Sequence, residues 1–129
     1  MEKKKLEKII SIVVVILVLV GIGFFFYNKS KQPGEHDQVA QCLAEKGVVM
    51  YGAWWCPHCK AQKEEFGKSF KYIKYVECAL PGNQKGQTQE CNDAGVKGYP
   101  TWKFPDGTVF EGEQSIKKLA ETAKCEIQK

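Results

Sequence analysis

Apolar residues are distributed along this chain in two different ways. Residues 9–27, IISIVVVILVLVGIGFFFY, form one apolar run in which Ser11 is the only polar side chain. A helix of this length rises ~28 Å, about the thickness of the hydrocarbon core of a bilayer. The run is longer than the core of a typical signal peptide, and bulky residues follow it instead of a small-x-small cleavage site. The pattern predicts a retained transmembrane anchor over 9–27, with a cleaved signal peptide as the alternative.

After this run the pattern becomes that of a folded domain. Residues 28–36 are polar and contain Pro33 and Gly34, which is typical of a linker. From residue 37 onwards, short segments alternate between helical and strand periodicity, with a loop expected at 80–87. The expected order is α-β-α-β-α-β-β-α, over 37–47, 48–54, 59–70, 72–78, 88–95, 99–104, 108–112 and 115–125. This order favours one α/β domain over 37–129, with a mixed sheet covered by helices on both faces.

Lysine alone supplies the positive side chains of the chain. The formal net charge is +4 and the sequence contains no arginine. Proteins recognise guanine bases and phosphate groups with two parallel hydrogen bonds mainly through arginine, so we expect no nucleic-acid partner. Four lysines precede the apolar run, whereas only Lys29 and Lys31 follow it closely. The positive-inside rule then makes residues 1–8 a cytoplasmic tail and places the domain outside the cytoplasm, in a periplasm or at the cell surface.

The cysteines agree with this topology. All six lie beyond residue 41: Cys42, Cys56, Cys59, Cys78, Cys91 and Cys125. An even number of cysteines crowded into one small domain is typical of an oxidising compartment.

The stretch GAWWCPHCKAQ, residues 52–62, carries the candidate chemistry. Cys56 stands where an apolar strand ends and a helix begins, so unpaired backbone N–H groups and the helix dipole stabilise its thiolate. Pro57 suits an early helix position, and His58 adds an imidazole that stabilises the thiolate further. Cys59 lies one turn along, within reach of a mixed disulfide on Cys56. Stabilising the reduced thiolate makes the disulfide a stronger oxidant, so the motif predicts redox chemistry in the oxidising direction.

Two other interpretations of Cys56 and Cys59 fit less well. A structural zinc site needs four ligands, but no second C-x-x-C is present and the only histidines are His36 and His58. A structural disulfide across two residues constrains the unfolded chain very little. We therefore expect no metal and no cofactor.

Separate blocks of the sequence resemble a known family. WCPHC after an apolar strand, with GYPT further on, resembles the thioredoxin fold, and the Pro-His dipeptide resembles that of periplasmic disulfide oxidases of the Dsb type. The blocks CLAEKGVVMYGAWWCPHC, YVEC, QEC and GVKGYPTW are most similar to the thioredoxin-like domain that accompanies bacterial vitamin K epoxide reductase homologues. The resemblance covers residues 39–124. It implies a three-layer α/β/α sandwich with a mixed sheet.

The resemblance also implies a substrate site. Pro100 is then a cis-proline that faces the cysteine pair, and Tyr99 contacts the substrate backbone. We assign substrate binding to Trp55, Tyr99, Pro100 and Thr101, although a tryptophan beside a redox pair also simply shields it.

Two departures from the family pattern change what is expected. Many thioredoxins carry a buried acid six residues before the first cysteine, where this chain has Met50. That position therefore offers no carboxylate to take the proton from Cys59, which weakens a general-reductase interpretation. The four-helix membrane domain that reduces quinone is also replaced by a single anchor, so we expect such a partner to be a separate chain.

The remaining four cysteines fall into two groups. Cys78 and Cys91 flank twelve residues, and a disulfide there contributes ~3 kcal/mol by loop-closure entropy. The related domain has cysteines in both places, so we predict a structural bond, with a second redox relay as the alternative. Cys42 and Cys125 lie in the first and last helices of the domain, which we expect on opposite faces of the sheet. We therefore expect no bond between them, leaving free buried thiols or a contact with a partner protein.

These observations predict a membrane-anchored thiol-disulfide oxidoreductase outside the cytoplasm. Its expected substrates are protein thiols and disulfides, and its expected oxidising partner is a quinone-linked membrane protein of the vitamin K epoxide reductase type. An anchored reductant, as in cytochrome c assembly, and a non-catalytic thioredoxin-like binding module are the alternatives.

Overall fold

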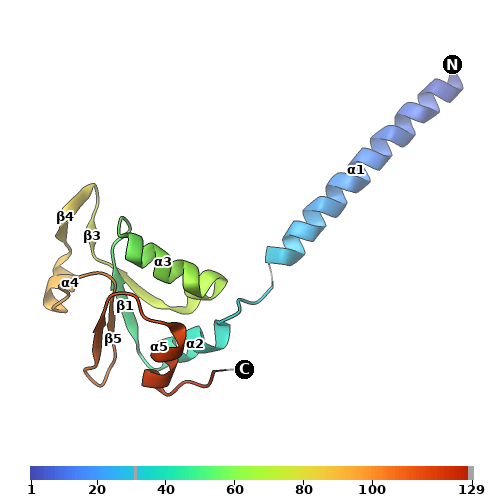
Figure 1. Cartoon of the computed structure of the whole chain (residues 1–129). Coiled ribbons are helices and arrows are strands. Elements are labelled where there is room, and N and C mark those ends of the chain that lie inside the picture. Colours follow the sequence, from blue (N-terminus) through green and yellow to red (C-terminus); the bar gives the residue numbers. More distant parts are fainter. Residues whose placement is uncertain (31, 128–129) are drawn as a thin grey trace. The chain divides into compact units, whose positions relative to one another are not determined.

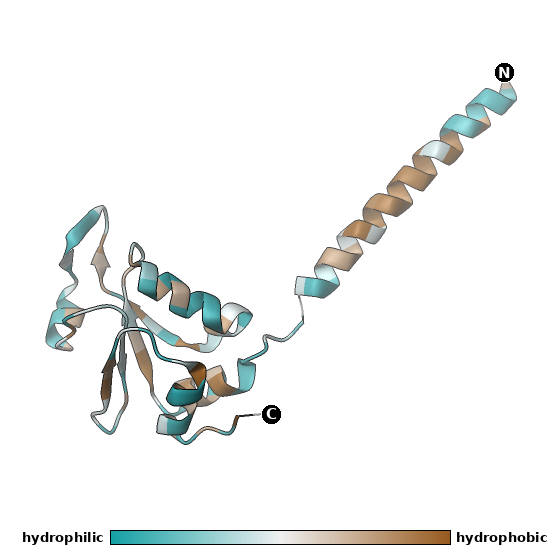
Figure 2. Ribbon diagram, in the orientation of Figure 1, coloured by the Kyte–Doolittle hydropathy of each residue, from teal (hydrophilic) through white to brown (hydrophobic). Residues whose placement is uncertain are grey.

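The computed structural model describes residues 1–30 and 32–127, and its chain divides into two compact units, residues 1–32 and 33–129. The first unit consists of one helix, α1 (Glu2–Ser30), none of whose residues is buried. Figure 2 shows the apolar middle of α1 and its hydrophilic start. By length and composition α1 is able to cross a membrane, and both a membrane anchor and a signal sequence fit this description.

The second unit is built on a mixed sheet of four strands. In spatial order these are β2 (Lys74–Glu77), β1 (Val49–Gly52), β5 (Thr101–Lys103) and β6 (Val109–Glu111). The β1–β2 pair is parallel, whereas the β1–β5 and β5–β6 pairs are antiparallel. The parallel pair needs a crossover, and a helix with a following 3₁₀ turn supplies it.

Helices cover both faces of this sheet, but unequally (Figure 1). The helices are α2 (Asp37–Glu45), α3 (Pro57–Phe66), the 3₁₀ helix η1 (Gly67–Tyr72), α4 (Gln89–Asp93) and α5 (Ile116–Ala123). Because side chains alternate along a strand, Met50 faces the core shared by α2, α3 and α5, whereas Tyr51 faces a smaller cluster at α4. The result is the thioredoxin-like α/β/α arrangement that the sequence predicts.

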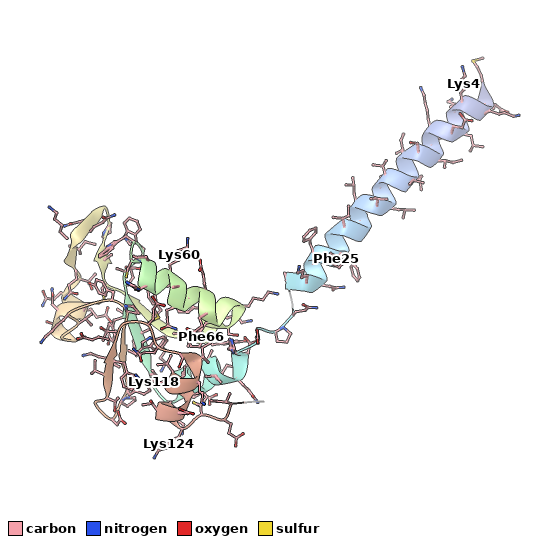
Figure 3. All side chains as sticks on the ribbon, viewed as in Figure 1. Lys4, Phe25, Lys60, Phe66, Lys118 and Lys124 are labelled. Carbon is pink, nitrogen blue, oxygen red and sulfur yellow. A yellow bond between two sulfur atoms is a disulfide. The ribbon has the colours of Figure 1, made fainter. Side chains whose placement is uncertain are left out.

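Fully buried side chains hold α3 and α5 to the larger face. Phe66 points from α3 toward the sheet, while Lys60 points away from it (Figure 3). The Phe66 ring lies 5.9 Å from that of Trp102 on β5, and the Trp102 indole N–H donates to the buried Gln62 amide at 3.2 Å. Gln62 also bonds the backbone of Gln114, just before α5. These contacts hold the middle and the end of α3 against the sheet and against the segment that leads into α5.

Two segments differ from the sequence prediction. Residues 80–87 were expected as a loop, but most of them belong to a hairpin of β3 (Ala79–Leu80) and β4 (Asn83–Gln87). Their polar composition hides the short strands, because exposed strands need no apolar alternation. The helical periodicity expected through residue 70 ends earlier, since Gly67 adopts a positive φ of 53° and η1 follows.

The prediction for Cys42 and Cys125 was wrong, because the two residues form a disulfide with a Cα–Cα distance of 6.0 Å. The helices α2 and α5 pack on the same face of the sheet and share one core. The chain reverses at Lys124, so that Cys125 donates its N–H to the carbonyl of Ala120 at 2.8 Å. Closing a loop with a sequence separation of 83 contributes roughly 4.5 kcal/mol by chain entropy.

A second disulfide links Cys78 and Cys91 on the smaller face. Both cysteines are fully buried, and the bond ties α4 to the end of β2. With a sequence separation of 13, its contribution is roughly 3 kcal/mol. The hairpin β3–β4 lies between the two cysteines in sequence, so this bond also closes the base of the hairpin.

Candidate active site

Cys56 and Cys59 are the free cysteines of the part of the chain that the structure describes, and both are buried. Cys56 is the residue just before α3, with an extended backbone, and Pro57 occupies the first turn of the helix. Its N–H donates to the carbonyl of Ala53, and its own carbonyl accepts from Lys60 as the helix begins. The thiol pair therefore lies at the junction of strand and helix that the sequence predicts.

The Tyr99–Pro100 loop lies beside Cys56. The peptide bond between Tyr99 and Pro100 is cis, and the Cys56 thiol donates to the Tyr99 carbonyl with an S···O distance of 3.7 Å. The rings of Trp55 and Tyr99 meet edge to face with centroids 6.0 Å apart. Thr101 is buried, and its hydroxyl donates to the carbonyl of Gly98 at 2.7 Å. The structure thus brings together all four residues assigned to substrate binding, with Trp55 and Tyr99 only half-buried.

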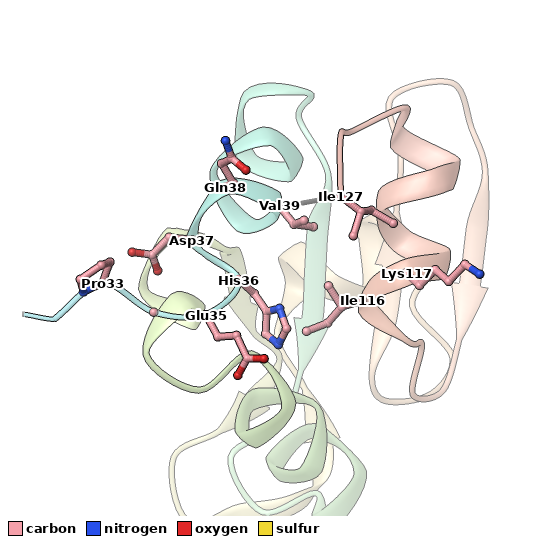
Figure 4. A pocket seen from close by; sticks show the side chains of 10 residues that line it. Pro33, Glu35, His36, Asp37, Gln38, Val39, Ile116, Lys117 and Ile127 are labelled. Atoms are coloured by element: carbon pink, nitrogen blue, oxygen red, sulfur yellow. The ribbon is translucent and has the colours of Figure 1, made fainter. Parts of the chain in front are cut away.

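A cavity of about 490 Å³ opens next to these two aromatic residues. It lies between Trp55, Tyr99 and the β3–β4 hairpin, and its lining includes Lys85 and Lys97. Another cavity, of about 560 Å³, lies between residues 33–39, α5 and Ile127 (Figure 4). This second cavity shares no lining residue with the thiol site, so of these two cavities the first is the one that adjoins the candidate chemistry.

His58 lies on the outer side of the motif. Its Nδ1 is 2.6 Å from Oε1 of Glu113, a residue in the segment between β6 and α5. Both side chains are largely in solvent, 67% and 44% exposed. Glu113 is 55 residues from His58 in sequence, and no local pattern indicates that the two side chains meet. The role of His58 toward the Cys56 thiolate stays a prediction.

Cys59 has a very different environment on the inner side. Its side chain is 1% exposed, and burial, together with the neighbouring Cys56, raises the pKa of the Cys59 thiol to about 12. A Cβ added at Gly52 would lie 2.9 Å from Cys59 Sγ and 3.2 Å from the Tyr75 hydroxyl oxygen. A side chain at position 52 would therefore clash with both the thiol and Tyr75, and only glycine leaves room for these two groups beside β1.

Glu77, at the end of β2, completes this inner side. One carboxylate oxygen accepts from the backbone N–H groups of Trp54 and Ala79, both at 3.0 Å. The other oxygen accepts from the Tyr75 hydroxyl at 2.7 Å. Burial, and then this hydrogen bond, raise the pKa of Tyr75, so its phenol keeps its proton.

The two lysines of α3 also differ. Lys60 is exposed and lies 4.0 Å from Glu64, as expected for a solvated helix residue. Lys63 is half-buried, and its Nζ lies 3.7 Å from the centroid of the Tyr75 ring. Its positive charge lowers the pKa of Cys59, which partly opposes the effect of burial.

Sequence reasoning missed Tyr75 and Glu77, although a signal for them exists. In the parallel pair of β1 and β2, Met50 is paired with Tyr75 and Gly52 with Glu77. Side chains at positions 75 and 77 therefore share the face of the sheet on which α3 lies. Among the residues that the structure describes, no group of three or more His, Cys, Asp or Glu side chains is arranged to hold a metal ion.

Comparison with known proteins agrees with this geometry. A dithiol at the start of a helix, beside a cis-proline loop on a mixed sheet, defines a thioredoxin-like protein. The family model for thioredoxin matches residues 28–126. The chain belongs to the thioredoxin family.

Its curated relatives are larger proteins. The chain is 44% identical over 86 residues to thiol-disulfide oxidoreductase LTO1 of Arabidopsis thaliana, a match that covers 64% of this chain and 23% of that protein. It is 38% identical over 88 residues to protein disulfide isomerase-like 2-2 of Oryza sativa subsp. japonica, covering 61% and 23%. It is 31% identical over 87 residues to the protein disulfide-isomerase A6 homolog of Drosophila melanogaster, covering 64% and 20%. The chain thus spans about a fifth to a quarter of the length of these relatives.

Proposed function

We propose that this chain is a membrane-anchored thiol-disulfide oxidoreductase that oxidises protein thiols outside the cytoplasm. The observation that carries the proposal is the pair of free thiols at the start of α3, with Cys56 against the Tyr99 carbonyl. Membership of the thioredoxin family and similarity to proteins named as thiol-disulfide oxidoreductase and disulfide isomerases support it.

The oxidising reaction starts from a Cys56–Cys59 disulfide. A substrate thiolate attacks Cys56 Sγ, which forms a substrate–Cys56 disulfide and breaks the Cys56–Cys59 bond. Cys59 leaves with the electron pair and takes up a proton. The second thiolate of the substrate then attacks the substrate sulfur of the mixed disulfide and releases Cys56 as a thiolate. Two electrons pass to the enzyme, and the substrate gains one disulfide.

The surrounding residues have separate roles in this proposal. Trp55 and Tyr99 form the exposed wall against which the substrate segment lies, while Pro100 and Thr101 hold that loop from within. Pro57 starts α3, so that backbone N–H groups face the Cys56 thiolate. His58 adds a polar group at the rim, where a substrate thiol enters.

The anchor and the partner belong to the same proposal. Residues 9–27 of α1 span the membrane, residues 1–8 lie in the cytoplasm, and the domain is outside. A quinone-linked membrane protein of the vitamin K epoxide reductase type, on a separate chain, accepts the two electrons and restores the Cys56–Cys59 disulfide.

Trapping tests the activity. In the full-length chain, Cys59→Ala removes the thiol that releases bound proteins, so substrates and the redox partner should stay attached to Cys56 through a disulfide. Cys56→Ala is the matched control and should capture nothing. If the two variants recover the same proteins, Cys56 is not the attacked residue and the proposal fails.

The direction of electron flow has its own test. An oxidant should hold Cys56 and Cys59 mostly as a disulfide in intact cells, and its reduction potential should lie well above the ~−270 mV of thioredoxin. A mostly reduced pair with a potential near that value would assign the chain to the reductants instead.

A further inference from the structure

The proposed function, on which this inference rests, requires Cys59 to give up and regain a proton. Cys59 must become a thiolate each time it attacks a mixed disulfide on Cys56, as when a partner reoxidises the enzyme. Its side chain is 1% exposed, so water does not reach the sulfur freely. Burial also raises its pKa to about 12, which leaves almost no thiolate at neutral pH. A nearby group has to accept the proton.

The ionisable groups that face Cys59 come from three elements. Cys56 immediately precedes α3 and Lys63 lies on it, Tyr75 and Glu77 lie on β2, and Tyr99 precedes β5. Lys63 is a cation and has no lone pair to accept a proton. Cys56 is the sulfur under attack in this step. Tyr99 donates its hydroxyl proton to Gln87, in the hairpin. This leaves the two residues on β2.

Tyr75 lies near the thiol, and it is hydrogen-bonded to Glu77. A Cβ built on Gly52 would lie 3.2 Å from the Tyr75 hydroxyl oxygen and 2.9 Å from Cys59 Sγ, so both groups approach the same point beside β1. The same hydroxyl donates to Glu77 at 2.7 Å. Glu77 is half-buried, so its carboxylate can exchange a proton with solvent while it accepts the hydrogen bond of Tyr75.

We propose that Tyr75 and Glu77 carry the proton of Cys59 in each disulfide exchange, with Glu77 as the base and Tyr75 as the relay. In the attacking direction, the Cys59 S–H proton moves to the Tyr75 oxygen while the Tyr75 hydroxyl proton moves to Glu77 Oε2. The Cys59 sulfur forms the bond to Cys56, and the bond from Cys56 to the partner sulfur breaks. The partner leaves as a thiolate with the electron pair. When substrate is oxidised, the same protons return and Cys59 leaves as a thiol.

This arrangement supplies from the neighbouring strand what β1 lacks. Met50 is fully buried on the face toward the core and has no proton-accepting group. The strand pairing places Tyr75 beside Met50 and Glu77 beside Gly52. A carboxylate at the end of β2 therefore serves the same thiol from another position in the fold.

The test separates the two thiols within one experiment. The fully folded, full-length chain in detergent, with only Cys56 and Cys59 reduced, is mixed with dithiobis(nitrobenzoate) in a stopped-flow instrument. The first release of thionitrobenzoate reports attack by Cys56, and its rate scales with reagent concentration. The second release reports attack by Cys59 on the mixed disulfide and does not depend on that concentration.

Glu77→Gln keeps the shape and an oxygen acceptor for the backbone N–H groups, and Tyr75→Phe keeps the ring. Each should slow the second release about tenfold or more near neutral pH, since general-base assistance is usually worth at least that much. The defect should shrink as pH rises, because hydroxide then removes the proton. The matched controls Glu64→Gln, on the exposed face of α3, and Tyr72→Phe, in η1, should leave both releases unchanged.

The outcomes are distinguishable. If the second release keeps the wild-type rate in both variants, or slows by the same factor at every pH, Tyr75 and Glu77 do not transfer the proton. If both releases slow equally, Glu77 only shapes the Trp54 turn and the inference is again wrong. If the wild-type chain gives no first release, the proposed function fails instead.

Discussion

The thiol pair has ionisable side chains on two sides, and these differ in their exposure to solvent. On the outer side, His58 meets Glu113 in solvent. On the inner side, the buried Cys59 lies near Tyr75, which contacts the half-buried Lys63 and Glu77. Water screens the outer pair, so it contributes about 1 kcal/mol or less, whereas partial burial strengthens every interaction on the inner side. We therefore expect the outer side to adjust the encounter of Cys56 with a substrate and the inner side to govern the step at Cys59.

Filling the inner space should have the largest effect. Gly52→Val places side-chain carbon 2.9 Å from Cys59 Sγ and from a ring carbon of Tyr75. We expect a loss of about 1–3 kcal/mol in the free energy of unfolding, because overpacking a core displaces its neighbours. Urea denaturation measures this loss, and the second thionitrobenzoate release should slow with it.

Gly98→Val is the matched control, since a Cβ at Gly98 meets nothing within 4 Å. Its stability should stay within ~0.5 kcal/mol of wild type, as for an ordinary surface substitution. Equal stability of the Gly52 and Gly98 variants would show that the inner space is not closed.

The pH dependence of the free energy of unfolding, measured with Cys56 and Cys59 reduced, should also report the burial of the Cys59 thiol. Because the pKa of Cys59 rises from 9.0 in a free thiol to about 12 in the fold, the unfolded chain loses this proton first. The contribution of the Cys59 thiol to the free energy of unfolding is thus fully present below about pH 9 and is lost as pH rises toward about 12. Urea midpoints of the reduced wild type and Cys59→Ala, compared at about pH 8 and about pH 10.5, should diverge. Parallel pH dependence in the two proteins would contradict the burial of the thiol.

The position of the active thiols could be predicted from the sequence, whereas their inner partners could not. The strand, the C-x-x-C spacing and the helix start are local, so residues 48–59 contain all the information needed to place Cys56. The bond between Cys42 and Cys125 depends on which face α2 covers, and that is decided by packing against segments far away in sequence. Glu77 is likewise 23 residues from its partner Trp54 in sequence, and Glu113 is 55 residues from its partner His58. Strand register was the one available signal for Glu77, and it required the pairing of β1 with β2.

A smaller effect is expected from the lysine of the inner side. Lys63→Met keeps much of the packing on Tyr75 but removes the charge that lowers the pKa of Cys59. The second release should slow about twofold to fivefold, since the interaction of a partly exposed charge with a neighbouring group is typically worth up to ~1 kcal/mol. Lys60→Met, one helical turn earlier and exposed, should leave the rate unchanged. Equal effects of the two variants would mean that net charge alone, and not the position of Lys63, matters.

The smallest effect is expected on the outer side. Glu113→Gln keeps a side chain that hydrogen-bonds His58 but removes the negative charge 2.6 Å from its ring. Because both side chains are solvated, the rate of the first release should change by about threefold or less, and added salt should reduce the difference further. The second release should not change, since Glu113 contacts His58 in solvent whereas the Cys59 thiol is buried. A salt-independent change in the second release would show that the outer pair acts on the buried thiol, and the separation of the two sides would then be wrong.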